Sequence, residues 1–494
     1  MKLHSVSILL VLGAMACSLA AADPALKRRQ VDEQPPEATQ DPIDQTGARK
    51  QPKDAEARFR WNTRTLVAEY EAIGRRSPKW DGPANKALGM LARGRSYGPN
   101  FDTNFWQVVH DSCQEAVSAG CDDPLIRYVH TRYVIGPASR ASKETAPQYI
   151  DAARQMRESK YSDIRKFYAC LRAAEAAKAA AGKNNPHTPR EVHEFRKAAA
   201  DYLTSVVQDG TIPGGEIYDA CFQLLDASRL NPREHEAFFN VLEPHLVKNW
   251  PQEASLYLLR GNYYIDYAWH ARGNAVASRV TAEGWKGFAE RLVVAQKCLE
   301  KAWKLDPTDA RIPVAMIILE LGQGEGRDRM EMWFQRAMEL DPNNYHACWQ
   351  KLYYLAPKWY GSPKDMLDFG RECAASEQWG GRVPLMLLEA HVHLAYYTGR
   401  EAGNAARKDY WKQPAIWEDV KTSFDKFFQL HPAAVGYRSQ YVRYAYRCEQ
   451  WEELNKQLSL LGPVNYDDFG GKQKFDEMVK LAKEHVGKGG KVAD

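Results

Sequence analysis

The stretch LEKAWKLDP, at residues 299–307, returns 35 residues later as FQRAMELDP, at residues 334–342. In each copy a large apolar residue, a small alanine and a leucine follow at intervals of three, which places them on one face of a helix. The closing Asp-Pro ends the helix, because proline donates no backbone hydrogen bond and biases the preceding residue away from helical dihedral angles. A period of about 35 residues with this ending predicts paired helices stacked into an α-solenoid.

The residues before and within the first copy resemble a tetratricopeptide repeat (TPR). The large, small and aromatic positions of the first TPR helix are filled by Tyr257, Gly261 and Tyr264. The second TPR helix and the proline after it are matched by Ala295, Leu299, Ala302 and Pro307. The segment between Gly261 and Ala295 is about twenty residues longer than a TPR unit of about 34 residues allows. This resemblance implies a TPR-like superhelix.

The second copy resembles the family through Phe334, Ala337 and Pro342, with Met330 where a small residue is usual. The match covers residues 251–345. The chain is also similar to secreted bacterial proteins that carry an inserted, Trp-rich repeat domain of uncharacterised function.

From Phe59 onward, helical patterns follow one another with almost no period-two alternation of β-branched residues. We therefore expect an all-α fold, an α-solenoid of stacked antiparallel helix pairs. The predicted organisation is a signal peptide (1–22), a disordered linker (23–57), an N-terminal helical domain (58–250), a TPR-like repeat domain (251–465) and a C-terminal segment and tail (466–494). The boundary near Trp250 is open, since one continuous superhelix fits the pattern as well.

The first residues have the pattern of a secretory signal: Lys2, an apolar run from Ser5 to Ala16, and small residues at Ala20-Ala21-Ala22. The alternative is a lipid anchor at Cys17, which the preceding residues fit less well. No later segment reaches the roughly 18 apolar residues of a transmembrane helix. We therefore expect an exported protein, periplasmic or extracellular, with envelope association left open and with no transmembrane span.

Charge and cysteine usage restrict the possible partners. A formal net charge of +4 with interspersed signs argues against nucleic acid. Export would permit disulfides, yet most cysteines lie singly in helical patterns and are expected to be buried thiols. Cys113 and Cys121 flank a short turn, and the sequence leaves their pairing open.

No catalytic or cofactor motif is present in the sequence. His391 and His393 lie two positions apart, so on a helix they point in different directions and cannot bind one ion together. Zinc, phosphate-loop and nucleophile-elbow patterns are missing. Asp122-Asp123 and Glu452-Glu453 are adjacent carboxylates that diverge on a helix, and the first pair is expected to cap the helix that begins at Leu125. We therefore expect no enzyme, no cofactor and no metal.

Aromatic residues are abundant, with 14 Trp, 25 Tyr and 16 Phe, and most are expected to fill the gaps between stacked helix pairs. The TPR resemblance implies that the inner face of each first helix lines a binding groove. By position, that face presents Leu258, Asn262 and Asp266, followed after Pro342 by Trp349 and Tyr353. The Asn262 position matches a residue that grips a peptide carboxylate in some TPRs, but Leu258 stands where they need a lysine.

Two functions remain open. The first is a non-catalytic extracytoplasmic scaffold that binds a protein or peptide segment through a concave surface, with Asn262, Asp266, Trp349 and Tyr353 as partner-binding residues. Trp349 and Tyr353 would be aromatic anchors, unless both rings are buried between repeats. The second is a helical superhelix that binds or processes cell-envelope glycan on exposed aromatic rings.

Overall fold

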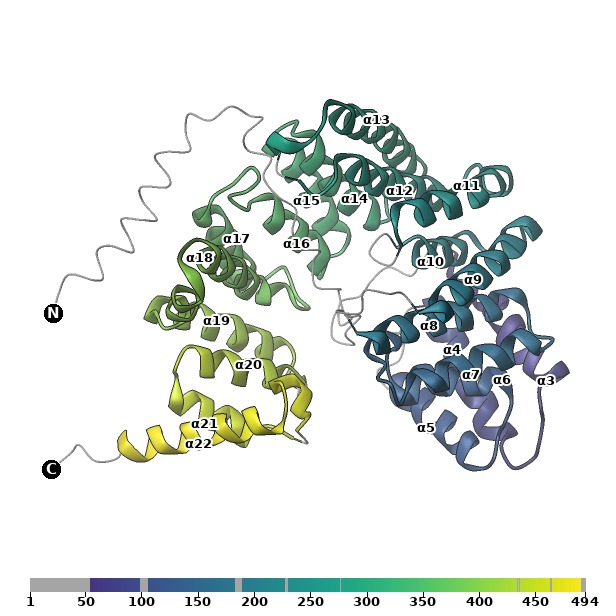
Figure 1. Cartoon of the computed structure of the whole chain (residues 1–494), viewed down its shortest axis with the longest axis horizontal. Coiled ribbons are helices and arrows are strands. Elements are labelled where there is room, and N and C mark those ends of the chain that lie inside the picture. Colours follow the sequence, from purple (N-terminus) through teal and green to yellow (C-terminus); the bar gives the residue numbers. More distant parts are fainter. Residues whose placement is uncertain are drawn as a thin grey trace. The chain divides into compact units, whose positions relative to one another are not determined.

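A computed structural model describes residues 54–97, 105–182, 189–226, 230–275, 277–432, 434, 436–462 and 464–489. All regular elements in these ranges are helical, which confirms the all-α class (Figure 1). The predicted signal peptide, Cys17 and nearly all of the predicted linker lie outside the described residues. The first described helix begins at Ala55, before the predicted domain start at residue 58.

The described residues divide into two compact units. The N-terminal unit comprises residues 54–272 and 283–307, and the C-terminal unit comprises 308–489 together with the short segment 273–282. This division falls after the Asp306-Pro307 helix stop. The predicted domain boundary near Trp250 stays a prediction.

The N-terminal unit is a succession of helices, several of which pack against the next one along the chain, as α7, α8 and α9 do in Figure 1. Its elements are α2 (Ala55–Thr63), η3 (Arg64–Ala68), α3 (Glu69–Ile73), α4 (Asp81–Tyr97), α5 (Phe105–Ser118), α6 (Pro124–His130), η5 (Thr131–Ile135), η6 (Ala138–Arg140), α7 (Ala146–Glu158), α8 (Asp163–Ala181), α9 (Arg190–Asp209), α10 (Gly214–Leu224), α11 (Pro232–Asn249), α12 (Ala254–Arg272) and α13 (Ala282–Leu305).

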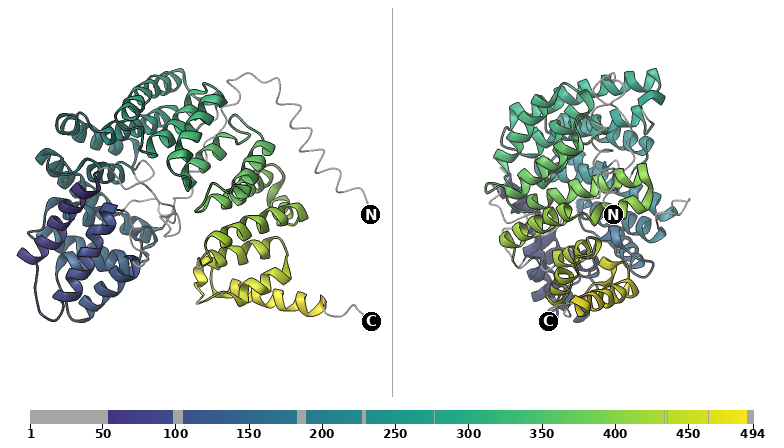
Figure 2. Two further views of the ribbon diagram at one scale, coloured as in Figure 1. Left: turned by 180° about the vertical axis from the view of Figure 1, so that it is seen from behind. Right: turned by 90° about the vertical axis from the view of Figure 1, so that its left-hand side faces the viewer.

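In the C-terminal unit, helices contact their nearest neighbours in sequence, and the left view of Figure 2 shows its last helices, in yellow, beside one another. Its elements are η7 (Ala277–Arg279), α14 (Arg311–Gln323), α15 (Arg327–Leu340), α16 (Tyr345–Tyr354), α17 (Pro363–Ala375), η8 (Val383–Leu385), α18 (Met386–Trp411), α19 (Pro414–Leu430), α20 (Gly436–Arg447), α21 (Trp451–Ser459), η9 (Tyr466–Phe469) and α22 (Lys472–Gly489). Helix α18 is kinked at Gly403, whose φ of 88° is non-helical.

The repeated stretch that predicts the helix ends also accounts for the packing around them. Helices α13 and α15 end at Leu305 and Leu340, directly before each Asp-Pro. The small residues of the motif are fully buried, as Ala302 and Ala337 show. At Gly261 a Cβ atom would lie 2.4 Å from the Leu299 side chain, so glycine is what allows α12 and α13 to approach closely there.

Two further sequence expectations are settled by local geometry. Asp123 caps α6, because its carboxylate accepts hydrogen bonds from the backbone N–H groups of Leu125 and Ile126. All eight cysteines after Cys17 are buried free thiols, so Cys113 and Cys121 are not joined. None of the helices that the structure describes combines the length and apolar character needed to cross a bilayer.

Candidate functional site

The two predicted site residues of the N-terminal unit lie on α12, but they do not form an open groove. Leu258, on the same face, is fully buried, and α12 packs against α10. The Asn262 amide donates a hydrogen bond of 3.4 Å to the Tyr218 hydroxyl of α10. This face of α12 therefore contacts the preceding helices, at least as far as Asn262.

Asp266 is a partly buried carboxyl for which the described residues provide no hydrogen bond or ion pair. Burial, with a smaller contribution from the negative charge of Asp226, raises its pKa to about 7. One turn further along α12, the His270 ring meets His235 of α11 edge-on, with ring centroids 5.4 Å apart. His235 is fully buried, and burial lowers its pKa to about 4. The charge of Asp226 acts on the pKa of both Asp266 and His235. The sequence pattern does not reveal this proximity.

The two predicted anchors of the C-terminal unit, Trp349 and Tyr353, stack on each other one turn apart on α16, with ring centroids 5.2 Å apart. Only 7% of Trp349 and 9% of Tyr353 is exposed. Trp359 and His393 lie against the same pair, and the Lys358 ammonium sits 4.4 Å from the Tyr353 ring centre. This burial favours the alternative in which both rings pack between helices.

His391 belongs to a hydrogen-bonded chain that resembles a catalytic relay. Its ring nitrogens lie 2.9 Å from the Tyr410 hydroxyl and 3.1 Å from the Asp419 carboxylate. Asp419 is paired in turn with Arg371. With only 1% of its surface exposed, His391 cannot reach a substrate, and the chain ties α18 to α19. Within the described ranges no group of His, Cys, Asp and Glu side chains is arranged to hold a metal ion.

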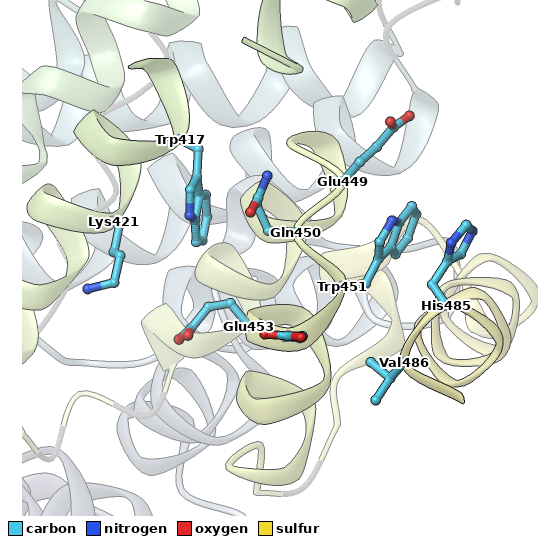
Figure 3. Close-up of a pocket in the computed structure, with 9 residues that line it drawn as sticks. Trp417, Lys421, Glu449, Gln450, Trp451, Glu453, His485 and Val486 are labelled. Carbon is cyan, nitrogen blue, oxygen red and sulfur yellow. The ribbon is translucent and has the colours of Figure 1, made fainter. Parts of the chain in front are cut away.

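A surface cleft of about 630 Å³ opens among the last helices of the C-terminal unit (Figure 3). We call it the acidic-aromatic cleft, after its lining residues: Trp417 and Lys421 of α19, Glu449 and Gln450 before α21, Trp451, Glu452 and Glu453 in the first turn of α21, and His485 and Val486 of α22. Only the Glu452-Glu453 pair was prominent in the sequence.

The aromatic wall of the cleft is built from separate helices. The Trp451 ring lies face to face with His485, with centroids 4.3 Å apart and planes 8° apart (Figure 3). Trp417 is largely buried against Tyr441, with ring centroids 6.1 Å apart, and its remaining surface faces the cleft. Trp417 and Lys421 lie one turn apart, so they share a face of α19.

The turn before α21 places the glutamates. Glu449 has a φ of 55°, and among the described residues no other non-glycine residue has a positive φ. This left-handed conformation costs free energy and is found preferentially at functional sites. The turn at Glu449 follows the end of α20, and α21 begins two residues after it, at Trp451. Glu452 and Glu453 therefore fall in the first turn of α21, where the helix dipole favours negative charge.

The lining of the cleft holds three glutamates and one lysine, and Glu453 also pairs with Lys456 at 3.5 Å. Glu449 pairs with Lys412 at 2.8 Å, and Glu453 accepts a hydrogen bond of 2.7 Å from Gln457. Lys421 is bonded to Asp425, and this bond, followed by the charges of Asp425, Glu453 and Glu418, raises its pKa.

Glu452 is exposed and makes no hydrogen bond or ion pair with any described residue. It remains available to a cationic group of a ligand.

Comparison with known protein families and with curated proteins finds no family model that matches the chain and no curated protein similar to it in sequence. The function therefore has to be argued from the geometry of the molecule.

Proposed function

We propose that the protein is a non-catalytic scaffold, built as a TPR-like α-solenoid and exported from the cytoplasm, that binds a basic segment of a partner protein. The contacts of the C-terminal unit support the solenoid, because α14 to α19 pack mainly against their first and second neighbours along the chain. The signal pattern of residues 1–22 supports export.

The acidic-aromatic cleft is the observation that carries the proposal. A Lys or Arg side chain that enters it meets the ring of Trp451, which attracts cations, and a surplus of carboxylates that attracts them electrostatically. The cleft is open to the surface, so a side chain of a bound segment can enter it. The partner is accordingly a protein segment that presents a basic side chain.

Glycan binding is the second candidate, because a partly exposed tryptophan ring next to carboxylates also suits a sugar. The two candidates differ in their dependence on charge. A neutral sugar gains little from three glutamates, whereas a basic peptide loses affinity when salt screens them.

The test compares two probes on the full chain: a ten-residue peptide of alternating Lys and Gly, and a neutral tetramer of N-acetylglucosamine. Binding is followed by tryptophan fluorescence and calorimetry at low and at physiological salt. We expect the peptide to bind more tightly at low salt, and a peptide with Glu in place of Lys to fail.

Trp451→Ala should weaken peptide binding by about tenfold or more, since loss of an interface hot spot costs on the order of 2 kcal/mol. Phe222→Ala is the matched control, because this ring is 48% exposed and lies on α10, in the other unit. Binding of the sugar with indifference to the peptide would replace the scaffold by the glycan function. If neither probe binds, the cleft serves neither the scaffold function nor the glycan function.

A further inference from the structure

The N-terminal unit contains a cluster of arginines that the proposed function does not use. Five side chains contribute, from α2, α4, η5 and α8, and we call them the arginine cluster: Arg58, Arg95, Arg132, Arg165 and Arg172. Three are buried and the other two are partly exposed. Arginines at such depth are normally paired with carboxylates.

Glu216 of α10 compensates part of this charge. It is fully buried, and its carboxylate accepts hydrogen bonds from Arg58 at 3.1 Å, from Tyr168 at 3.0 Å and from Arg95. Burial alone would raise its pKa, but Arg95 and Arg58 outweigh burial and hold the pKa at about 2. Glu216 is therefore ionised and fully engaged.

The other carboxylates near the cluster also have identified contacts. Asp219 pairs with Arg58 at 2.6 Å, and Glu175 pairs with Arg172 at 2.7 Å. Two more carboxylates accept backbone N–H groups: Asp54 from Gly215 and Glu69 from Ser162. Their negative charges favour the charged forms of Arg58 and Arg165 respectively.

Arg165 is bound by neutral acceptors rather than by a carboxylate. It donates to the Asn62 side-chain oxygen at 2.8 Å, and to the hydroxyl and carbonyl oxygens of Thr65. Burial and the like charge of Arg95 lower its pKa to about 10.

Arg132 is the member without a counter-ion. It forms no ion pair with any residue that the structure describes, and its guanidinium lies 5.5 Å from the centre of the Tyr133 ring. The pKa of Arg172 is lowered first by its own burial and next by the positive charge of Arg132. The two guanidiniums therefore repel each other. The buried Nε–H groups of Arg95 and Arg172 also find no acceptor. Burial disfavours the charge of Arg132, but its neighbours Tyr133 and Tyr128 outweigh burial and raise its pKa. Among the described residues no carboxylate pairs with this guanidinium.

The backbone holds Arg132 in this position through a rare element. Arg132 lies in η5, a π-helical turn, and η3, the π-helical turn that contains Thr65, contacts the same cluster. The Tyr149 hydroxyl is hydrogen bonded to the carbonyl oxygens of Thr131, the first residue of this turn, and of Gly136, the residue after it. π-Helical turns are rare and occur frequently at functional sites.

We propose that Arg132, with Arg95 and Arg172 beside it, binds an anionic group of a ligand, either a phosphate or a carboxylate. The planar guanidinium fork matches both oxyanions bidentately. Arg132 as a whole residue is only partly buried, and this binding requires that its guanidinium be open to the ligand. The bound anion supplies the negative charge that the chain itself does not provide there.

The test measures thermal unfolding of the full chain with inorganic phosphate, with succinate and with chloride at equal ionic strength. We expect phosphate or succinate to raise the midpoint in a saturable way, because a ligand that binds only the folded state stabilises it. The anion that acts identifies the source: phosphate points to a phosphorylated ligand and succinate to a carboxylate ligand.

Arg132→Gln should abolish this rise and, in chloride, unfold at about the same temperature as the wild type, because no ion pair is lost with the guanidinium. Arg132→Lys keeps the charge but loses the fork, so it should retain only part of the rise. Arg127→Gln is the matched control, since Arg127 is exposed and lies five residues earlier, and it should respond as the wild type does.

Three outcomes would overturn the proposal. The first is a wild-type midpoint that is indifferent to both anions. The second is an equal rise in wild type and Arg132→Gln, which would reveal a general salt effect. The third is an Arg132→Gln protein that unfolds earlier than the wild type in chloride and still responds to the anions, which would assign Arg132 to packing alone.

Discussion

Replacing Asp266 by Asn should make the protein more stable at neutral pH and have little effect at pH 4. The folded protein raises the pKa of this carboxyl from 3.8 to about 7, through burial and through Asp226. Each pKa unit corresponds to about 1.4 kcal/mol. At most, about 4 kcal/mol of unfolding free energy is therefore lost when Asp266 ionises in the folded state.

The sign of the pH dependence follows from proton binding in the two states. Below pH 4 the carboxyl is protonated in both states and has no effect. Between pH 4 and 7 the folded state keeps the proton that the unfolded state has released, so the free energy of unfolding falls as the pH rises. Above pH 7 both states are ionised and the loss is complete.

The assay is urea unfolding of wild type and Asp266→Asn at intervals from pH 4 to 8. The stability of the variant relative to the wild type should rise across this range by about 4 kcal/mol at most and then level off. His235, whose pKa is lowered to about 4, makes the stability of both proteins rise between pH 4 and 6.5. Its contribution therefore cancels in the difference.

Asp201→Asn is the control, because Asp201 is an exposed carboxylate that pairs with Lys197 at the surface. Exposed ion pairs contribute little, so its difference curve should stay flat. If the stability of Asp266→Asn relative to the wild type stays flat or falls with pH, burial does not raise the pKa of the Asp266 carboxyl, and the reasoning is refuted.

Two packing predictions complete the set. Ala337→Phe should lower the unfolding midpoint clearly, since overpacking a buried site costs about 1 to 3 kcal/mol. Gln335→Phe, on the exposed face of α15, should scarcely change the midpoint. Equal effects of the two substitutions would mean that the buried face of α15 is assigned wrongly. Replacing both Trp349 and Tyr353 by Ala should destabilise the C-terminal unit before binding is affected, because loss of a buried tryptophan alone costs about 3 to 5 kcal/mol. Circular dichroism measures the folding of the double variant, and calorimetry measures its binding. A stably folded double variant with weakened partner binding would show that both rings belong to the binding surface.

The sequence was sufficient for the features that depend on local pattern. The helix stops at Leu305 and Leu340, the burial of Ala302 and Ala337 and the Asp123 cap all follow from spacing along one or two helices. Such signals are read within a few turns, where the geometry of the helix fixes which side chains are neighbours.

The candidate sites were not predictable in the same way. Trp451 and His485 stack although 34 positions separate them, and Arg58 meets Glu216 across 158 positions. No periodicity records such pairs, because they depend on how complete helices pack. The TPR resemblance placed Leu258 on an open inner face, and the structure buries it. The Glu452-Glu453 pair was visible in sequence, but its importance came only with the tryptophans that α19 and α21 bring beside it.

The N-terminal unit holds two ionisable side chains that form no ion pair with any described residue, Asp266 and Arg132. Selection for stability alone removes isolated buried charges or pairs them, since each one costs free energy that marginally stable proteins do not have in excess. Buried ionisable groups without a partner of opposite charge are therefore found preferentially at binding sites. The two side chains respond to burial in different ways: Asp266 becomes neutral by keeping its proton near pH 7, whereas a guanidinium cannot release its own proton in a protein. Arg132 needs an external anion to balance its charge, which makes it the stronger indication of a bound ligand.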